Sequence, residues 1–185
     1  MLNNADKILV TSNVTKQEFQ NKTDKPIAVI TNGYDVTKSS IQPLDKEFTL
    51  AHIGSFLSKR NPEILWQALK ELVTENQDFA KLFKLNLVGL VSEDVIKNIE
   101  NYELAKYVNN VGYVSHSESI VFQRKSQILL LIEIDSEDTK AIIPGKLFEY
   151  MVSNRPIIAI GPSGSDVEKI IKETNTGDYF YYDAL

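Results

Sequence analysis

The sequence predicts an α/β fold built on a doubly wound parallel sheet. Short apolar runs alternate with segments of helical periodicity along most of the chain, as they do when each strand is followed by a covering helix. The run at 128–132 (ILLLI) is apolar at every position, which is typical of a parallel strand covered on both faces. Glycine also follows four of the predicted strands at their carboxyl ends: Gly54, Gly89, Gly112 and Gly161.

The first 47 residues are predicted to form a separate piece. We expect strands at 7–11 and 27–30, a helix at 14–21 and a turn at 31–35, with Ser12 or Asn13 as the helix N-cap. Residues 36–47 are polar, contain Pro43 and show no periodicity, so they predict a linker. Residues 1–47 are therefore expected to be the tail of one unit, joined to a second unit at 48–185.

The second unit alternates strand and helix. Strands are predicted at 48–53, 83–88, 108–111, 128–132, 157–160 and 179–182. Helices are predicted at 62–75, at 93–100 with a possible extension to 107, from 115 or 117, at 145–153 and at 165–173. Pro62 suits the first turn of its helix. Apolar residues recur at helical spacing along that helix and predict its buried stripe: Ile64, Leu65, Ala68, Leu69 and Leu72.

Composition narrows the class of protein. The 185 residues are 43% hydrophobic and 24% charged, as in soluble globular proteins. The net charge of −5 argues against a general nucleic-acid binder. The absence of cysteine excludes disulfides and thiolate zinc sites. No apolar run reaches membrane-spanning length and no signal-peptide pattern is present, so a cytoplasmic setting is expected.

The segment 142–162 (IIPGKLFEYMVSNRPIIAIGP) carries the most informative pattern. A glycine at the helix start, Gly145, leaves backbone N–H groups free to face an anion, which the helix dipole also favours. Glu149 lies about one turn further on and can accept two hydrogen bonds from a diol. The competing interpretation is an ordinary amphipathic helix, with Leu147 in the core and Lys146 and Glu149 in solvent.

A ligand crevice is expected near the carboxyl ends of the strands. The four glycines end strands at that edge, although glycine also serves ordinary tight βα turns. Lys59 and Arg60 leave the first strand of the unit, and a guanidinium there can bind a diphosphate. Such a pair is also common as a solvated lead-in to a helix.

Other site chemistry lacks its signatures. His52 lies among apolar strand residues and is predicted to be a core histidine, whereas His116 is expected in a helix-cap region. The two histidines do not have metal-ligand spacing, and the acidic cluster from Glu133 to Asp138 does not match a calcium loop. The sequence contains no P-loop lysine motif, no G-x-S-x-G elbow and no complete G-x-G-x-x-G.

Several segments resemble the C-terminal half of GT-B fold glycosyltransferases. They are TNGYD, HIGSFLSKRNPEILWQAL, NLVGL, VNNVGYVSHSES, ILLLIE and, most specifically, PGKLFEYMVSNRPIIAI. The likeness is to retaining, nucleotide-sugar-dependent enzymes that build bacterial polysaccharides. It implies a Rossmann-like donor-binding domain at 48–185. It also implies that 1–47 is a remnant of the acceptor-binding domain with the interdomain connector, to which Asn32, Gly33 and Asp35 belong.

The resemblance also implies residue roles. The donor diphosphate would be bound by residues after the first strand and at the helix start: Gly54, Ser55, Lys59, Arg60, Gly145, Lys146 and Leu147. Glu149 would bind the ribose, and the nucleobase would face Gly112, Tyr113 and Val114. Two positions depart from the family pattern, because Ser55 stands where a basic residue is usual and Ala141 where an acidic one is usual. Glu137 or Asp138 is expected to replace the latter near the donor sugar, together with Pro144.

The resulting expectation is a metal-independent hexosyltransferase that needs no cofactor. Its donor would be a nucleoside-diphosphate sugar and its acceptor a glycan or lipid-linked sugar. The full-length enzyme is expected to associate peripherally with the cytoplasmic face of a membrane, and this piece to be inactive without its N-terminal domain. Two alternatives remain open, a nucleotide-sugar 2-epimerase and a non-catalytic nucleotide-binding module.

Overall fold

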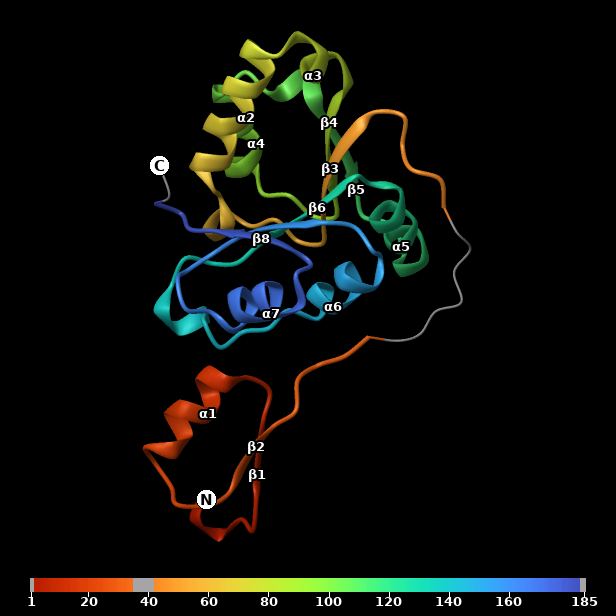
Figure 1. Cartoon of the computed structure of the whole chain (residues 1–185). Coiled ribbons are helices and arrows are strands. Elements are labelled where there is room, and N and C mark those ends of the chain that lie inside the picture. Colours follow the sequence, from red (N-terminus) through yellow and green to blue (C-terminus); the bar gives the residue numbers. More distant parts are fainter. Residues whose placement is uncertain (1, 35–41, 184–185) are drawn as a thin grey trace.

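The computed structural model describes residues 2–34 and 42–183, which form two separate sheets (Figure 1). In the smaller one, β1 (Ile8–Val10) and β2 (Ile27–Val29) pair in parallel and are connected by α1 (Asn13–Gln20). The Ser12 side chain caps α1 by accepting from the Thr15 amide. Asp35 and residues 36–41, half of the predicted linker at 36–47, lie outside the described residues.

The larger sheet has six parallel strands in the order β5-β4-β3-β6-β7-β8. Their bounds are β3 (Phe48–Ile53), β4 (Phe83–Val88), β5 (Val108–Gly112), β6 (Ile128–Ile132), β7 (Ile157–Ile160) and β8 (Gly177–Phe180). In order along the chain these are strands 3-2-1-4-5-6 of a doubly wound sheet. The order switches between β3 and β6, whose carboxyl ends therefore border the expected ligand crevice.

Helices cover both faces of this sheet. One face packs against α2 (Glu63–Glu75), α3 (Gln77–Leu82) and α4 (Glu93–Asn101), and the other against α5 (His116–Lys125), α6 (Gly145–Val152) and α7 (Asp166–Thr174). Short 3₁₀ turns lie at η1 (Leu2–Asn4), η2 (Ser58–Arg60), η3 (Ala105–Tyr107) and η4 (Glu137–Thr139). None of the helices described is long and apolar enough to cross a bilayer. The predicted doubly wound α/β fold is confirmed.

Three element predictions were wrong in detail. Helix α3 was not expected; it forms because the Asn76 side chain accepts from the amides of Asp78 and Phe79. The helix at 93 does not extend to 107, since Glu103 has φ 57° and breaks it. The last strand is 177–180 rather than 179–182, because Gly177 pairs with Ile157 where an added Cβ would meet the Ile157 carbonyl oxygen.

The predicted buried stripe of α2 was right only in part: Leu69 is buried and Leu65 packs against the core. The fully buried residues of α2 are Trp66, Leu69 and Val73, whereas Leu72 is 48% exposed. The stripe expected from the sequence instead borders an apolar groove on the sheet face, lined among others by Ile64, Ala68 and Leu72. Helix α2 thus has two apolar sides, and only one of them lies against the core.

Helix α6 is held to the sheet by one buried side chain. The Tyr150 hydroxyl accepts a hydrogen bond from the Ile53 amide at 2.9 Å and donates to the Ile53 carbonyl at 3.3 Å. Tyr150 is fully buried, and burial raises its pKa well above the ordinary value, so the hydroxyl remains a donor. This contact places the first turn of α6 beside the end of β3.

Removal of this hydroxyl should destabilise the fold. We expect Tyr150→Phe to lower the free energy of unfolding by about 1–3 kcal/mol, because it leaves buried Ile53 backbone groups without a partner. Tyr102→Phe is the matched control, since the Tyr102 hydroxyl makes no hydrogen bond to any described residue; its effect should stay within about 0.5 kcal/mol. Urea unfolding followed by circular dichroism compares them. Equal effects would contradict the proposed anchoring role of Tyr150.

Candidate functional site

The first turn of α6 separates two cavities at the carboxyl edge of the sheet. The larger, of about 450 Å³, is lined by residues of the connector, α5 and α6, including Tyr34, His116, Gln123, Gly145 and Glu149. The smaller, of about 40 Å³, lies at the end of β6 and is lined by Arg60, Ile132, Glu133, Ile134, Thr139, Ile142, Pro144 and Lys146. Gly145 and Glu149 thus face one side, and Pro144 and Lys146 the other.

Two cationic side chains, Arg60 and Lys146, border the smaller cavity without forming an ion pair, and Glu133 lines the same cavity. Arg60 ends η2; its Nη1 donates to the Ser55 carbonyl at 3.3 Å, whereas its Nε is buried and makes no hydrogen bond. The Lys146 Nζ is buried and likewise makes no hydrogen bond. A Cβ added to Gly54 would lie 3.0 Å from this Nζ, so the ammonium sits over the end of β3. Neither cation forms an ion pair within the described part of the chain.

The charges of Arg60 and Lys146 repel each other, and the Glu149 charge offsets this repulsion at Lys146 only in part. Burial first, and then the Arg60 charge, lower the pKa of Lys146 from 10.5 to about 8. The amino end of α6 adds a positive dipole end to the same place. The Leu147 amide donates to the Pro144 carbonyl at 3.0 Å, while the amides of Gly145 and Lys146 have no backbone acceptor in the described residues. The site is therefore suited to a phosphate or diphosphate.

Glu149 is held on the opposite side of α6 by α5. Its Oε2 accepts a hydrogen bond from the side-chain Nε2 of Gln123 at 2.9 Å, and its Oε1 lies 3.2 Å from the His116 Nε2. The Glu149 side chain remains 33% exposed and lines the larger cavity. A carboxylate oriented in this way still has lone pairs for ligand hydroxyls.

The four strand-ending glycines serve different purposes. Gly54 has φ 110° and lies under Lys146, and because glycine has no side chain the Lys146 ammonium lies directly over the backbone at the end of β3. At Gly89, with φ 120°, a Cβ would lie 2.6 Å from the Gly54 carbonyl oxygen, which is a packing requirement. Gly112 has open space around it, and a Cβ on Gly161 would lie 2.6 Å from the Glu133 Oε2. Gly54 alone of these four adjoins the cation pair.

The structure leaves several predicted site residues apart from both cavities. Ser55 and Lys59 are exposed, and Tyr113 is 92% exposed in the loop after β5, between Gly112 and Val114. Glu137 and Asp138 are exposed on η4, where Glu137 pairs with Lys140 at 2.6 Å.

His52 is a core residue, as predicted. It is fully buried, and its ring nitrogens lie 3.1 Å from the Leu130 carbonyl and 3.4 Å from the Ser55 carbonyl. Burial, with the charge of Lys146 nearby, lowers the pKa of His52 to about 3, so the ring is neutral near pH 7. His52 thus supports the loop that begins at Ser55 from the side of the core.

Sequence reasoning missed three residues at these cavities. His116 was expected only as part of the α5 cap and Gln123 was not considered, yet both contact Glu149. Glu133 was considered only as part of an acidic cluster, yet it is 6% exposed and lines the smaller cavity. Its position was a usable signal, since it is the first polar residue after a wholly apolar strand at the ligand edge.

The fold of this chain is similar to those of several solved structures. The chain is similar to HepE of Anabaena in complex with UDP (TM-score 0.69, 15% identity, 95% of this chain and 50% of HepE). It is also similar to WaaG, a glycosyltransferase involved in lipopolysaccharide biosynthesis (TM-score 0.68, 11% identity, 96% and 50%). A third is S. aureus TarM in complex with fondaparinux, alpha-GlcNAc-glycerol and UDP (TM-score 0.59, 17% identity, 84% and 30%).

No protein-family model and no curated protein sequence matches the chain. The chain spans half or less of the length of these three structures. The six-stranded parallel sheet and its helices nevertheless align with theirs over most of this chain. The expected fold is confirmed: the six-stranded parallel sheet with its helices matches the Rossmann-like domains of GT-B glycosyltransferases.

Proposed function

We propose that this chain is the donor-binding part of a nucleotide-sugar-dependent glycosyltransferase. The observation that carries the proposal is a pair of cations beside the amino end of α6, Arg60 and Lys146, which form no ion pair among the described residues and whose Nε and Nζ atoms are buried without a hydrogen bond. A nucleoside diphosphate supplies the negative charge that such a pair lacks. Two of the structural neighbours were solved with UDP, which supports this class of ligand.

The diphosphate is proposed to lie over Gly54 and the first turn of α6. Arg60 and Lys146 would contact its oxygens, with the Gly145 and Lys146 amides as additional donors. Ser55, Lys59 and Leu147 remain proposed contributors, of which Lys59 would have to fold inward from solvent. In transfer of the sugar, the leaving diphosphate gains negative charge, and fixed cations and amides stabilise it without a metal.

The nucleoside is proposed to extend into the larger cavity. Glu149 would accept hydrogen bonds from the two ribose hydroxyls, with Gln123 and His116 orienting the carboxylate. The base would then face the loop of Gly112, Tyr113 and Val114. The exposed Tyr113 ring offers a surface on which a base can stack.

Transfer is proposed to need the rest of a longer enzyme. An acceptor glycan or lipid-linked sugar must approach the donor from the opposite side of the crevice, and this chain spans half or less of the length of the solved structures that it resembles. We therefore propose that residues 1–47 belong to an acceptor-binding domain and its connector. The 185-residue chain should bind nucleotide weakly and transfer no sugar. The complete enzyme would act at the cytoplasmic face of a membrane.

Calorimetric titration with UDP and with inorganic pyrophosphate tests the two halves of the site separately. Arg60→Ala should weaken both ligands roughly ten- to a hundred-fold, because each loses a charge-assisted hydrogen bond. Glu149→Ala should weaken UDP roughly ten-fold, yet leave pyrophosphate unchanged or slightly tighter, since it removes a ribose acceptor and a negative charge. Lys97→Ala, which removes an exposed charge on α4, is the matched control.

Two results would contradict the proposal. The first is the absence of binding by UDP and equally by ADP, GDP, CDP and dTDP. The second is an equal loss of UDP and pyrophosphate affinity in Glu149→Ala, which would mean that the carboxylate supports the fold rather than the ribose.

A further inference from the structure

The smaller cavity contains an unusual concentration of unsatisfied polar atoms. Among the described residues, five buried side-chain nitrogen or oxygen atoms have no hydrogen-bond partner, and three of these belong to residues that line this cavity: Arg60, Glu133 and Lys146. Buried polar groups in native proteins are nearly always paired, so such a cluster needs an explanation. Two of the three are the cations of the proposed diphosphate site; the third is a carboxyl group.

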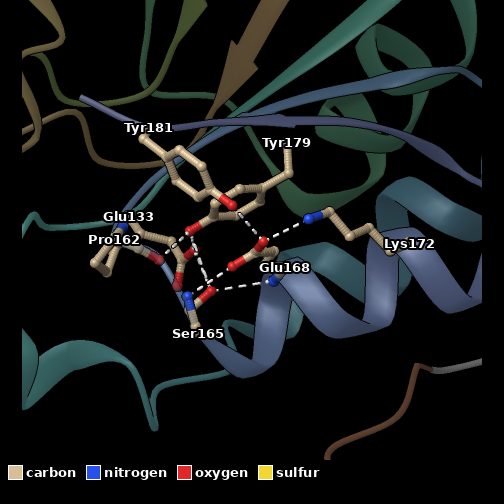
Figure 2. Close-up of polar contacts among 8 residues, drawn as sticks. Glu133, Pro162, Ser165, Glu168, Lys172, Tyr179 and Tyr181 are labelled. Carbon is tan, nitrogen blue, oxygen red and sulfur yellow. Dashed lines mark hydrogen bonds and ion pairs between the residues drawn. The ribbon is translucent and has the colours of Figure 1, made fainter. Parts of the chain in front are cut away.

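One oxygen of the Glu133 carboxyl group, Oε2, is hydrogen-bonded within the protein (Figure 2). It accepts from the Tyr179 hydroxyl at 2.6 Å and from the Ser165 hydroxyl at 3.0 Å. Gly161 makes room for this contact, because a Cβ there would lie 2.3 Å from the Tyr179 hydroxyl. These bonds connect the end of β6 to β8 and to the start of α7, and they fix the orientation of the carboxyl group.

The other oxygen of the carboxyl group, Oε1, has no such structural role. It is buried and makes no hydrogen bond to any described residue. A purely structural carboxyl group in this place would be expected to use both oxygens, or to be replaced by an apolar side chain of similar size. The arrangement therefore leaves one oriented oxygen for a group that enters the cavity.

The chemistry of the cavity indicates what that group is. Burial raises the pKa of Glu133 to about 7, although Tyr179 and Ser165 oppose the shift, so the carboxyl group exists in both protonation states near neutrality. A hydroxyl suits both states because it can donate to a carboxylate or accept from a carboxylic acid. The ionised form repels an anion placed directly at Oε1, and a cavity of about 40 Å³ accommodates only a small part of a ligand.

We propose that Glu133 binds a hydroxyl of the donor sugar through its Oε1, next to the diphosphate held by Arg60 and Lys146. The inference rests on the proposed function, since the sugar of a nucleoside-diphosphate sugar is attached directly to the phosphate that these cations bind. It assigns to Glu133 the donor-sugar role that the sequence led us to expect of Glu137 or Asp138. Both of those residues are exposed on η4, outside the cavity.

Binding of a free diphosphate and of its sugar conjugate distinguishes this role from a structural one. The nucleotide is first chosen from UDP, GDP, ADP, CDP and dTDP as the one that the 185-residue chain binds best. Its glucose, galactose and N-acetylglucosamine conjugates are then titrated. Glu133→Gln should weaken the best conjugate roughly five- to ten-fold, because a charge-assisted bond is lost, and change the free diphosphate by less than about two-fold.

Two further variants keep the test independent of folding effects. Ile142→Trp alters a cavity-lining residue that is 55% exposed, and the larger side chain should exclude the sugar while leaving the Glu133 bonds to Tyr179 and Ser165 intact. It should therefore weaken the conjugate selectively even if Glu133→Gln folds poorly. Glu173→Gln makes the same charge change at an exposed position of α7 and should alter neither ligand.

The outcomes separate this inference from the function on which it rests. The role of Glu133 is overturned, while nucleotide binding stands, in either of two cases. In the first, Glu133→Gln and Ile142→Trp bind the conjugate as tightly as the unaltered chain does. In the second, every conjugate binds the unaltered chain no more tightly than the free diphosphate does. If no nucleotide binds the unaltered chain, the proposed function fails and the inference with it.

Discussion

The hydrogen bonds between the Tyr150 hydroxyl and the backbone of Ile53 determine where the rest of the site can form. They attach α6 to the last residue of β3, which is next to the switch in strand order between β3 and β6. With α6 so placed, Lys146 lies over Gly54 and Glu149 faces α5. The anion-binding amino end of the helix and the carboxylate one turn later thus become two sides of one crevice.

The crevice departs from the rules that govern the rest of the fold. The core buries apolar side chains on both faces of the sheet, whereas three of the five buried, unpaired side-chain polar atoms in the described residues belong to the crevice: those of two neighbouring cations and of a half-satisfied carboxyl group. Each of these buried groups opposes folding, because desolvation of a charge is unfavourable without a partner. Functional sites are where such departures are expected, since the missing partner is the ligand.

Sequence reasoning predicted what depends on local pattern. The strands were predictable because parallel strands buried on both faces are continuous apolar runs, and Ser12 and Pro62 signalled the starts of α1 and α2. The pattern of α2 was misleading, because it has a second apolar side that periodicity cannot distinguish from the buried one. Gly177 was also missed as a strand start, because its role depends on how closely β7 approaches.

The same division applies to the site. The roles proposed for Gly145 and Glu149 could be expected from the sequence because they follow from the places of these residues in one helix. The role proposed for Glu133 was harder to predict. Its place after β6 was a signal, but Tyr179, Ser165 and Arg60 come from distant parts of the chain and meet it only in the folded sheet. His116 and Gln123 are similar, since their contact with Glu149 requires α5 and α6 to lie side by side.

The titration of the Lys146 ammonium by NMR, with Lys146→Met to assign the signal, tests the central claim most directly. In the free chain the pKa should be about 8, because burial and Arg60 disfavour the charged form. Saturation with UDP should move the pKa upward toward the ordinary 10.5, because the diphosphate favours the ammonium. Since UDP binding then takes up a proton above pH 8, UDP affinity should fall as the pH rises through about 8, where phosphate ionisation (pKa about 6) is complete. A free-chain pKa near 10.5, or no upward shift with bound UDP, would contradict the account.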